Sequence, residues 1–253
     1  MAKRPVIVHF HLFKNAGTSV DRILQDNFAK REWAEIEGPN RKKLDTADLV
    51  EFIRSKKALK AVSSHTAIVS VPELDDIEII PILFLRHPID RIRSAYDFEK
   101  KQVADTPGAK FAKKGSFEDY MEWRLTQPTK AQVSNFHAAR LKDFHRITPY
   151  RKTNLYLSRA KAAVDALPFV GIVEEFDQSM NKFEAIIAKH FSNFKAGSTR
   201  ENVTAPTDHS LQDNIKAFKQ RIGPSVFQKL KDLNDVDFEL YRYAKKRFVS
   251  QTG

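Results

Sequence analysis

The stretch HFHLFKNAGTSVDRIL, residues 9–24, contains the features that decide the fold of this chain. Residues 6–12 alternate between two faces, which predicts a β-strand with at least one well-buried face. The alternation stops at Lys14, and after Gly17 apolar residues recur at spacings of three and four, as on one face of a helix. Thr18 or Ser19 is expected to cap that helix. The stretch therefore predicts a strand, a short turn and a helix.

A turn of this kind is suited to binding an anion. Free backbone N–H groups and the positive end of the helix point at whatever lies in the turn. The turn is not a P-loop, because G-x-x-x-x-G-K-[ST] needs a second glycine and places the lysine after it. Here Lys14 precedes Gly17. Local sequence alone leaves two alternatives, a phosphate site or one of the many strand-turn-helix units that bind nothing.

Composition bounds the class of protein. The chain has 253 residues, 42% of them hydrophobic, which suits one domain over residues 1–253 with a sizeable core. Its 43 Lys and Arg against 32 Asp and Glu give a formal charge of +11. That surplus favours an anionic partner, although the scattered basic residues also fit a solvated surface. The absence of cysteine excludes disulfides, zinc–thiolate sites and thiol catalysis.

The sequence shows no targeting or membrane-spanning segment. No apolar run approaches the ~20 residues that cross a bilayer. The chain enters its first strand almost at once, which leaves no room for a signal peptide. The simplest expectation is a cytoplasmic enzyme.

Beyond the first unit, strands and helices are expected to alternate. The run 77–85 is almost continuously apolar, as in a central parallel strand, although Pro81 interrupts it and suggests an irregular start or a later one. Segments 100–115 and 194–209 are expected to be loops. The fold class is therefore α/β, with three layers around a central parallel sheet. Strands are further expected at 33–36, 60–64 and 169–173. Helices are expected after the caps Thr46 and Ser116, from Pro88 in a first helical position, at 131–144, 155–167 and 176–191, and as one last long helix over 226–248.

A second informative stretch is LFLRHPIDRIRSAYDF, residues 83–98. Arg86 lies at the carboxyl end of a predicted buried strand, where open parallel sheets bind ligands. Ser94 follows about two turns into the next helix. A guanidinium and a hydroxyl on one side are able to hold a phosphate. The alternative is that Arg86 forms a structural salt bridge at the end of the strand.

Taken together, the two stretches resemble the carbohydrate sulfotransferases that use 3′-phosphoadenosine 5′-phosphosulfate (PAPS). HLFKNAGTS (11–19) is similar to the family motif H-x-P-K-T-G-G-T-S, with Phe13 for Pro and Asn15-Ala16 for Thr-Gly. LRHPIDRIRSAY (85–96) matches L-R-x-P-x-x-R-x-x-S-x-Y completely. Weaker similarities follow in the family's order along the chain, at 135–141, 170–176 and 237–241, so the resemblance extends from near residue 6 to near residue 245.

The resemblance implies a P-loop-kinase-like sulfotransferase architecture and a set of site residues. Arg86 and Ser94 would bind the 3′-phosphate, and Arg200, in the loop 198–203, would close over the nucleotide. Lys14 would also be catalytic, by neutralising charge on the leaving oxygen. The 5′-phosphosulfate would be held by Lys14, Asn15, Ala16, Gly17, Thr18 and Ser19.

His65 stands where relatives of heparan sulfate 2-O-sulfotransferase have a catalytic base. An unperturbed imidazole pKa of ~6.5 suits proton removal at neutral pH. The alternative is a hydrogen-bonded histidine at a strand end. His9 and His11 are expected to be structural, and His87 is expected to cap its helix or face solvent.

The expected reaction is transfer of the sulfuryl group from PAPS to a hydroxyl of an acceptor, expected to be a saccharide, with no metal and no nucleic-acid partner. Loops 100–115 and 125–130 are expected to border the acceptor site. One alternative is a kinase-like phosphotransferase, for which the sequence offers no magnesium-binding Asp in place and no full glycine loop. The other is a basic nucleic-acid-binding protein, for which it offers no recognisable motif.

Overall fold

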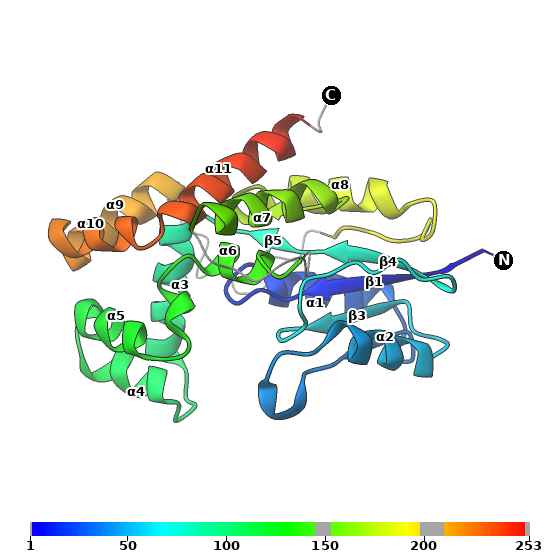
Figure 1. The fold of residues 1–253 in the computed structure, drawn as a ribbon, viewed down its shortest axis with the longest axis horizontal. Coiled ribbons are helices and arrows are strands. Elements are labelled where there is room, and N and C mark those ends of the chain that lie inside the picture. Colours follow the sequence, from blue (N-terminus) through cyan, green and yellow to red (C-terminus); the bar gives the residue numbers. More distant parts are fainter. Residues whose placement is uncertain (1, 145–152, 198–209, 251–253) are drawn as a thin grey trace.

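A four-stranded parallel sheet lies at the centre of the molecule (Figure 1). The computed structural model describes residues 2–144, 153–197 and 210–250. The strand order is β2-β3-β1-β4, and a separate parallel pair joins β5 to β6. The strands are β1 (Arg4–Phe10), β2 (Trp33–Glu35), β3 (Ala61–Ser64), β4 (Ile77–Ile82), β5 (Phe84–Leu85) and β6 (Gly171–Ile172).

Helices cover both faces of this sheet, as the alternation in β1 predicts. Val6 and Val8 point to the face covered by α2 (Thr46–Ser55), α7 (Thr153–Ala166) and α11 (Asp235–Ser250). Ile7 points to the opposite face, against α1 (Gly17–Asn27) and α8 (Phe176–Ile187). The three-layer α/β architecture expected from the sequence is confirmed.

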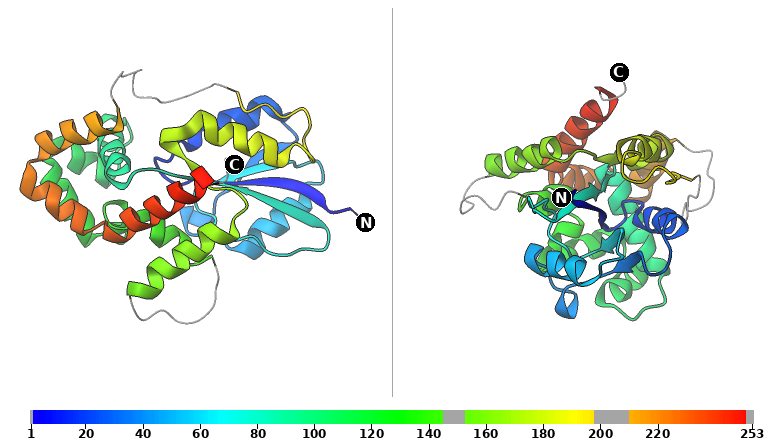
Figure 2. Two further views of the ribbon diagram at one scale, coloured as in Figure 1. Left: turned by 90° about the horizontal axis from the view of Figure 1, so that it is seen from above. Right: turned by 90° about the vertical axis from the view of Figure 1, so that its right-hand side faces the viewer.

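A second body of helices lies beyond the carboxyl ends of the strands (Figures 1 and 2). It has its own apolar core, which includes Ile92, Met121 and Phe218. Helix α3 begins directly after β5 and leads from the sheet into this body. Its helices are α3 (Pro88–Lys101), α4 (Pro107–Lys114), α5 (Phe117–Thr126), α9 (Leu211–Ile222) and α10 (Pro224–Asp232).

Several expectations about single elements are wrong. Segment 100–115 is not a loop, because Thr106 caps α4 and Pro107 fits its first turn. The last long helix is two helices, α10 and α11, separated at Asn234. Strand β4 runs through Pro81. The proline is tolerated there because β4 is an edge strand of its sheet.

Other boundaries also differ. Asp45 rather than Thr46 caps α2, through a side-chain hydrogen bond to the N–H of Ala47. Only Phe136–Leu141 of the expected helix 131–144 forms an α-helix, α6. Within the described residues, no helix is both long and apolar enough to span a bilayer.

Candidate active site

The turn after β1 has an unusual backbone. Lys14 and Ala16 both have positive φ angles, 62° and 60°. Ala16 is the N-cap of α1 and offers no side-chain cap, so the expected capping by Thr18 or Ser19 is wrong. This conformation turns the chain sharply from the strand into the helix within a few residues.

The backbone N–H groups of the turn fall into two sets. Those of Asn15 and Ser19 donate to Leu12 O and Ala16 O, at 3.1 Å each, and so stabilise the turn itself. Those of Ala16, Gly17 and Thr18 have no acceptor among the described residues. They lie at the N-terminus of α1, where the helix dipole favours an anion. An anion in the turn would therefore be bound by fewer backbone N–H groups than the sequence suggests, those of Ala16, Gly17 and Thr18.

The side chain of Asn15 is part of the scaffold beneath the turn. It is 2% exposed, and its Nδ2 donates to Phe13 O at 2.9 Å. Its Oδ1 accepts from Nε2 of buried His137, 2.8 Å away on α6. Asn15, where this chain departs from the Thr of the family motif, thus contacts His137 in the stretch 135–141.

Arg86 contacts the backbone of Lys14. Arg86 Nη1 donates to Lys14 O at 3.2 Å, and its Nη2 lies 2.6 Å from Asp90 Oδ2. The structural salt bridge considered for Arg86 is therefore present as well, and its side chain stays 17% exposed. Burial, and next the charge of Arg86, lower the pKa of Lys14. Ser94 lies two turns along α3 and is half-buried.

His65 has a partner that sequence reasoning missed. Its Nδ1 lies 2.7 Å from Glu37 Oε1, which also accepts from the His65 backbone N–H at 2.9 Å. Arg140, on α6, also donates to His65 O at 2.9 Å. Burial opposes ionisation of Glu37, but hydrogen bonds from Thr66 and His65 outweigh it and lower the pKa of that carboxyl.

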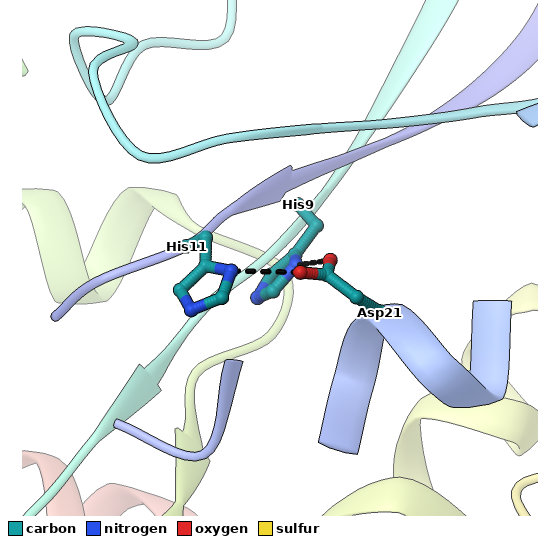
Figure 3. A group of neighbouring side chains, drawn as sticks. All are labelled: His9, His11 and Asp21. Carbon is teal, nitrogen blue, oxygen red and sulfur yellow. Dashed lines mark hydrogen bonds and ion pairs between the residues drawn. The ribbon is translucent and has the colours of Figure 1, made fainter. Parts of the chain in front are cut away.

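Two further histidines share one carboxylate below the turn (Figure 3). His9 Nδ1 lies 2.6 Å from Asp21 Oδ1, and His11 Nδ1 lies 2.7 Å from Asp21 Oδ2. All three side chains are buried, and they are close enough together to be considered as cation ligands. Ligands at ~2.0–2.2 Å from a common ion are ~3 Å or more apart. The shorter distances here are those of charge-assisted hydrogen bonds.

His11 lies between the turn and His65. Its ring stacks on that of His65, with centroids 3.8 Å apart. On its other side it contacts Gly17 so closely that a Cβ there would lie 2.1 Å from His11 Cδ2. Only glycine fits at position 17, for a reason that the sequence did not reveal. Arg200 and the segment 198–203 lie outside the described residues.

Comparison with known proteins agrees with this geometry. The model of the sulfotransferase family matches residues 1–244. The chain belongs to the sulfotransferase family. It is also 38% identical over 250 residues to an uncharacterized protein of Archaeoglobus fulgidus, covering 94% of this chain and 95% of that one. The chain is thus a PAPS-dependent sulfotransferase, and the kinase and non-enzymatic readings of the sequence are set aside.

Two acidic residues in the weaker family stretches hold the sulfotransferase site together. Glu174 Oε1 accepts from the His87 N–H at 2.8 Å, and its Oε2 accepts from Tyr241 at 2.9 Å. Asp237 accepts from the N–H groups of His137 and Ala138, both at 2.9 Å. The first contact fixes the start of α3, and the second fixes the start of α6.

His87 does neither of the things expected of it. It occupies the N-cap position of α3 without a side-chain hydrogen bond. Its ring packs edge-on against Phe238 and Tyr241, and its Nδ1 is buried with no partner among the described residues. Burial lowers the pKa of His87 to about 4, so the ring is neutral at pH 7.

Proposed function

We propose that this sulfotransferase acts on a hydroxyl of a carbohydrate, by in-line displacement with His65 as general base. The observation that carries the proposal is the meeting of three groups at the carboxyl ends of β1, β3 and β5. These are the anion cradle at Lys14, the Glu37–His65 pair and Arg86. Acid–base and anion-binding groups are thereby placed at the edge where parallel sheets bind ligands.

The cradle fits a phosphosulfate group. The N–H groups of Ala16, Gly17 and Thr18 supply donors that have no acceptor in the part of the chain that the structure describes, and α1 adds the positive end of its dipole. Asn15 and Ser19 contribute through the shape of the turn rather than through their N–H groups. Lys14 would neutralise the charge that develops on the bridging oxygen as the nucleotide leaves.

Recognition of the 3′-phosphate is assigned to Arg86 and Ser94. The guanidinium of Arg86 donates to Asp90 and to Lys14 O, which orients it and leaves other N–H bonds for a ligand. A nucleotide without a 3′-phosphate would lose these charge-assisted hydrogen bonds. Arg200 is proposed as a further contact from its position in the family's nucleotide loop alone.

His65 would take the proton of the acceptor hydroxyl. Because its Nδ1–H donates to Glu37, its Nε2 carries the lone pair that accepts a proton. The acceptor oxygen forms its bond to sulfur while the bond from sulfur to the phosphate oxygen breaks. The proton is transferred to Nε2, and the nucleotide product keeps the electron pair. No group in this sequence of steps has to be a metal ion.

Calorimetry and a transfer assay test the proposal. We expect 3′-phosphoadenosine 5′-phosphate (PAP) to bind at least tenfold more tightly than ATP, and sulfate from labelled PAPS to appear on saccharide hydroxyls. Transfer should persist with EDTA. Tighter binding of ATP would contradict the nucleotide site. Transfer to a non-carbohydrate acceptor alone would contradict the acceptor class.

A further inference from the structure

A cavity of about 400 Å³ opens beside Lys14, between the phosphate turn and the helical body. Its size lies within the ~300–1,000 Å³ of small-ligand pockets. Three aromatic residues line it, Phe13, Phe98 and Trp123. They come from the turn, from α3 and from α5, so the cavity exists only because these segments meet.

The aromatic wall connects the cavity to the catalytic lysine. Lys14 Nζ lies 4.6 Å from the centroid of the Phe98 ring. Phe13, the residue before Lys14, meets Phe98 edge-on with centroids 5.8 Å apart. Lys14 does not itself line the cavity, but two of the lining residues, Phe13 and Phe98, contact it or precede it in the chain. Phe13 is also where the turn departs from the proline of the family motif, so that departure supplies part of the wall.

The charges at the cavity are already paired. Glu99 Oε1 and Arg124 Nη2 are 2.5 Å apart, and both side chains are buried. Arg124 donates further to Tyr120 and to Thr129. Gly108 lets this guanidinium approach, since a Cβ there would lie 2.3 Å from Nη2. Among the described residues that line the cavity, Glu99 and Arg124 are the charged ones, so an ionic ligand would find no free counter-charge in the lining to offset its desolvation.

The remaining lining is uncharged: it combines Pro107, Gly108 and Pro128 with polar side chains, among them the amides of Gln102, Gln127 and Gln132. Gln132 Oε1 is buried and accepts no hydrogen bond from the described residues. Such amides donate to and accept from hydroxyl groups. The basic side chains of segment 100–115 are exposed and do not line the cavity: Lys100, Lys101, Lys110, Lys113 and Lys114.

We infer that this cavity binds the acceptor, and that the group bound there is an uncharged polyhydroxylated ring such as a neutral sugar residue. The inference rests on the proposed function and narrows it. The apolar face of the ring packs on Phe98 and Trp123, and its hydroxyls bond the glutamine amides. The lysines of segment 100–115 do not line the cavity, so they give no reason to expect an acidic saccharide there.

Tryptophan fluorescence tests the inference without any transfer reaction. The chain has two tryptophans, so Trp33→Phe leaves Trp123 as the single reporter. We expect saturable changes in its emission with at least one of the methyl glycosides of glucose, galactose, mannose and N-acetylglucosamine. Glucuronic and galacturonic acids should bind at least tenfold more weakly. Gln127→Ala should weaken the glycoside at least fivefold, whereas Gln212→Ala, exposed on α9, should not.

A titration with PAP in the same variants separates this inference from the proposed function. If PAP binds but no neutral glycoside changes the Trp123 signal, or if uronic acids bind more tightly, the acceptor inference is wrong and the nucleotide site stands. If neutral glycosides bind and PAP does not, the cavity assignment stands and the PAPS site is wrong. Equal weakening by Gln127→Ala and Gln212→Ala would also overturn the inference.

Discussion

The imidazole rings of His11 and His65 stack with centroids 3.8 Å apart and planes inclined by 28°. Each ring is held at Nδ1 by a carboxylate, Asp21 for His11 and Glu37 for His65, at 2.7 Å in both cases. Hydrogen bonds of this kind fix the orientation and the tautomer of an imidazole. The two residues therefore form one positioned pair beside the phosphate turn, with His11 buried and His65 reaching solvent.

Glu37→Gln tests the support of the proposed base. The amide cannot stabilise the imidazolium as a carboxylate does, so we expect kcat to fall tenfold or more while PAP affinity is unchanged. His65→Ala should lower kcat by ~10²–10⁴, the typical contribution of a positioned base. Because His65 is 52% exposed, added imidazole should partly restore that variant. Glu35→Gln, exposed on β2, is the control, and wild-type kcat in His65→Ala would refute the assignment.

Asp21→Asn should destabilise the protein. Burial raises the pKa of Asp21, but His9 and His11 more than compensate and hold it well below the usual range. The folded pKa is depressed, so this stabilisation is present above pH ~4 and is lost as the pH falls further. At pH 7 we expect a loss of about 2–4 kcal/mol in urea unfolding, from a broken buried charge network.

Asp26→Asn on the same helix is the matched control for Asp21→Asn. Its partner is Arg22 at 3.2 Å, and both side chains are about half exposed, so the loss should stay below ~1 kcal/mol. Equal losses in the two variants would show that the His9–Asp21–His11 contacts do not stabilise the fold.

Substitutions of Lys14 and Arg86 should affect different quantities, kcat for Lys14 and nucleotide affinity for Arg86. Lys14→Ala removes charge stabilisation that matters most in the transition state, so we expect kcat to fall by at least ~10² with a modest change in KM for PAPS. Arg86→Ala would remove the charge-assisted hydrogen bonds proposed between Arg86 and the nucleotide and should weaken PAP binding ~10–100-fold. Calorimetry with PAP and with adenosine 5′-phosphosulfate, which lacks the 3′-phosphate, makes the test specific. An equal loss for both ligands would contradict the 3′-phosphate role.

The fold was largely predictable, because local sequence patterns indicate most of its strands and helices. The alternation in 6–12 and the apolar run 77–85 both identify strands of the parallel sheet. Helix α4 was missed because Pro107-Gly108 is typical of a turn, although Pro107 also fits a helix start. The end of α10 was missed because the apolar spacing continues across Asn234. That side chain is buried and bonds the Val133 and Leu230 carbonyls, a tertiary contact.

Sequence motifs identified Lys14 and Arg86 as candidate site residues, each within its own chain segment, and their roles stay predictions. Glu37 was not identified, because its contact with His65 depends on the pairing of β2 with β3. The role of Asp21 was also hidden, because it depends on how α1 packs against β1: Asp21 joins His9 of β1 to His11, just after that strand. The sequence indicated only that Gly17 lies in the turn. The structure shows why the residue there is glycine: the ring of His11 leaves no room for a Cβ at position 17.

Ala16→Gly should stabilise the protein. Ala16 has φ 60°, a left-handed conformation that costs a residue with a Cβ ~1–2 kcal/mol and glycine almost nothing. Allowing for the greater freedom of glycine in the unfolded chain, we expect a gain of about 0.5–1 kcal/mol in urea unfolding. Ala217→Gly, at an exposed position inside α9, is the control and should lose ~0.5–1 kcal/mol. A loss in both variants would contradict the argument from backbone conformation.

His87→Leu should make the protein less sensitive to mild acid. Burial lowers the pKa of His87 to about 4, against ~6.5 in an unfolded chain; nearby Asp90 opposes the shift and Lys245 adds to it. Between these values the unfolded state binds more protons than the folded state, so wild-type stability falls as the pH drops from 6.5 toward 4. Leucine cannot titrate and keeps an apolar contact with Phe238 and Tyr241. Urea midpoints at pH 7, 6, 5 and 4.5 should therefore decline less steeply in the variant. Parallel declines in variant and wild type would show that another group causes the acid sensitivity.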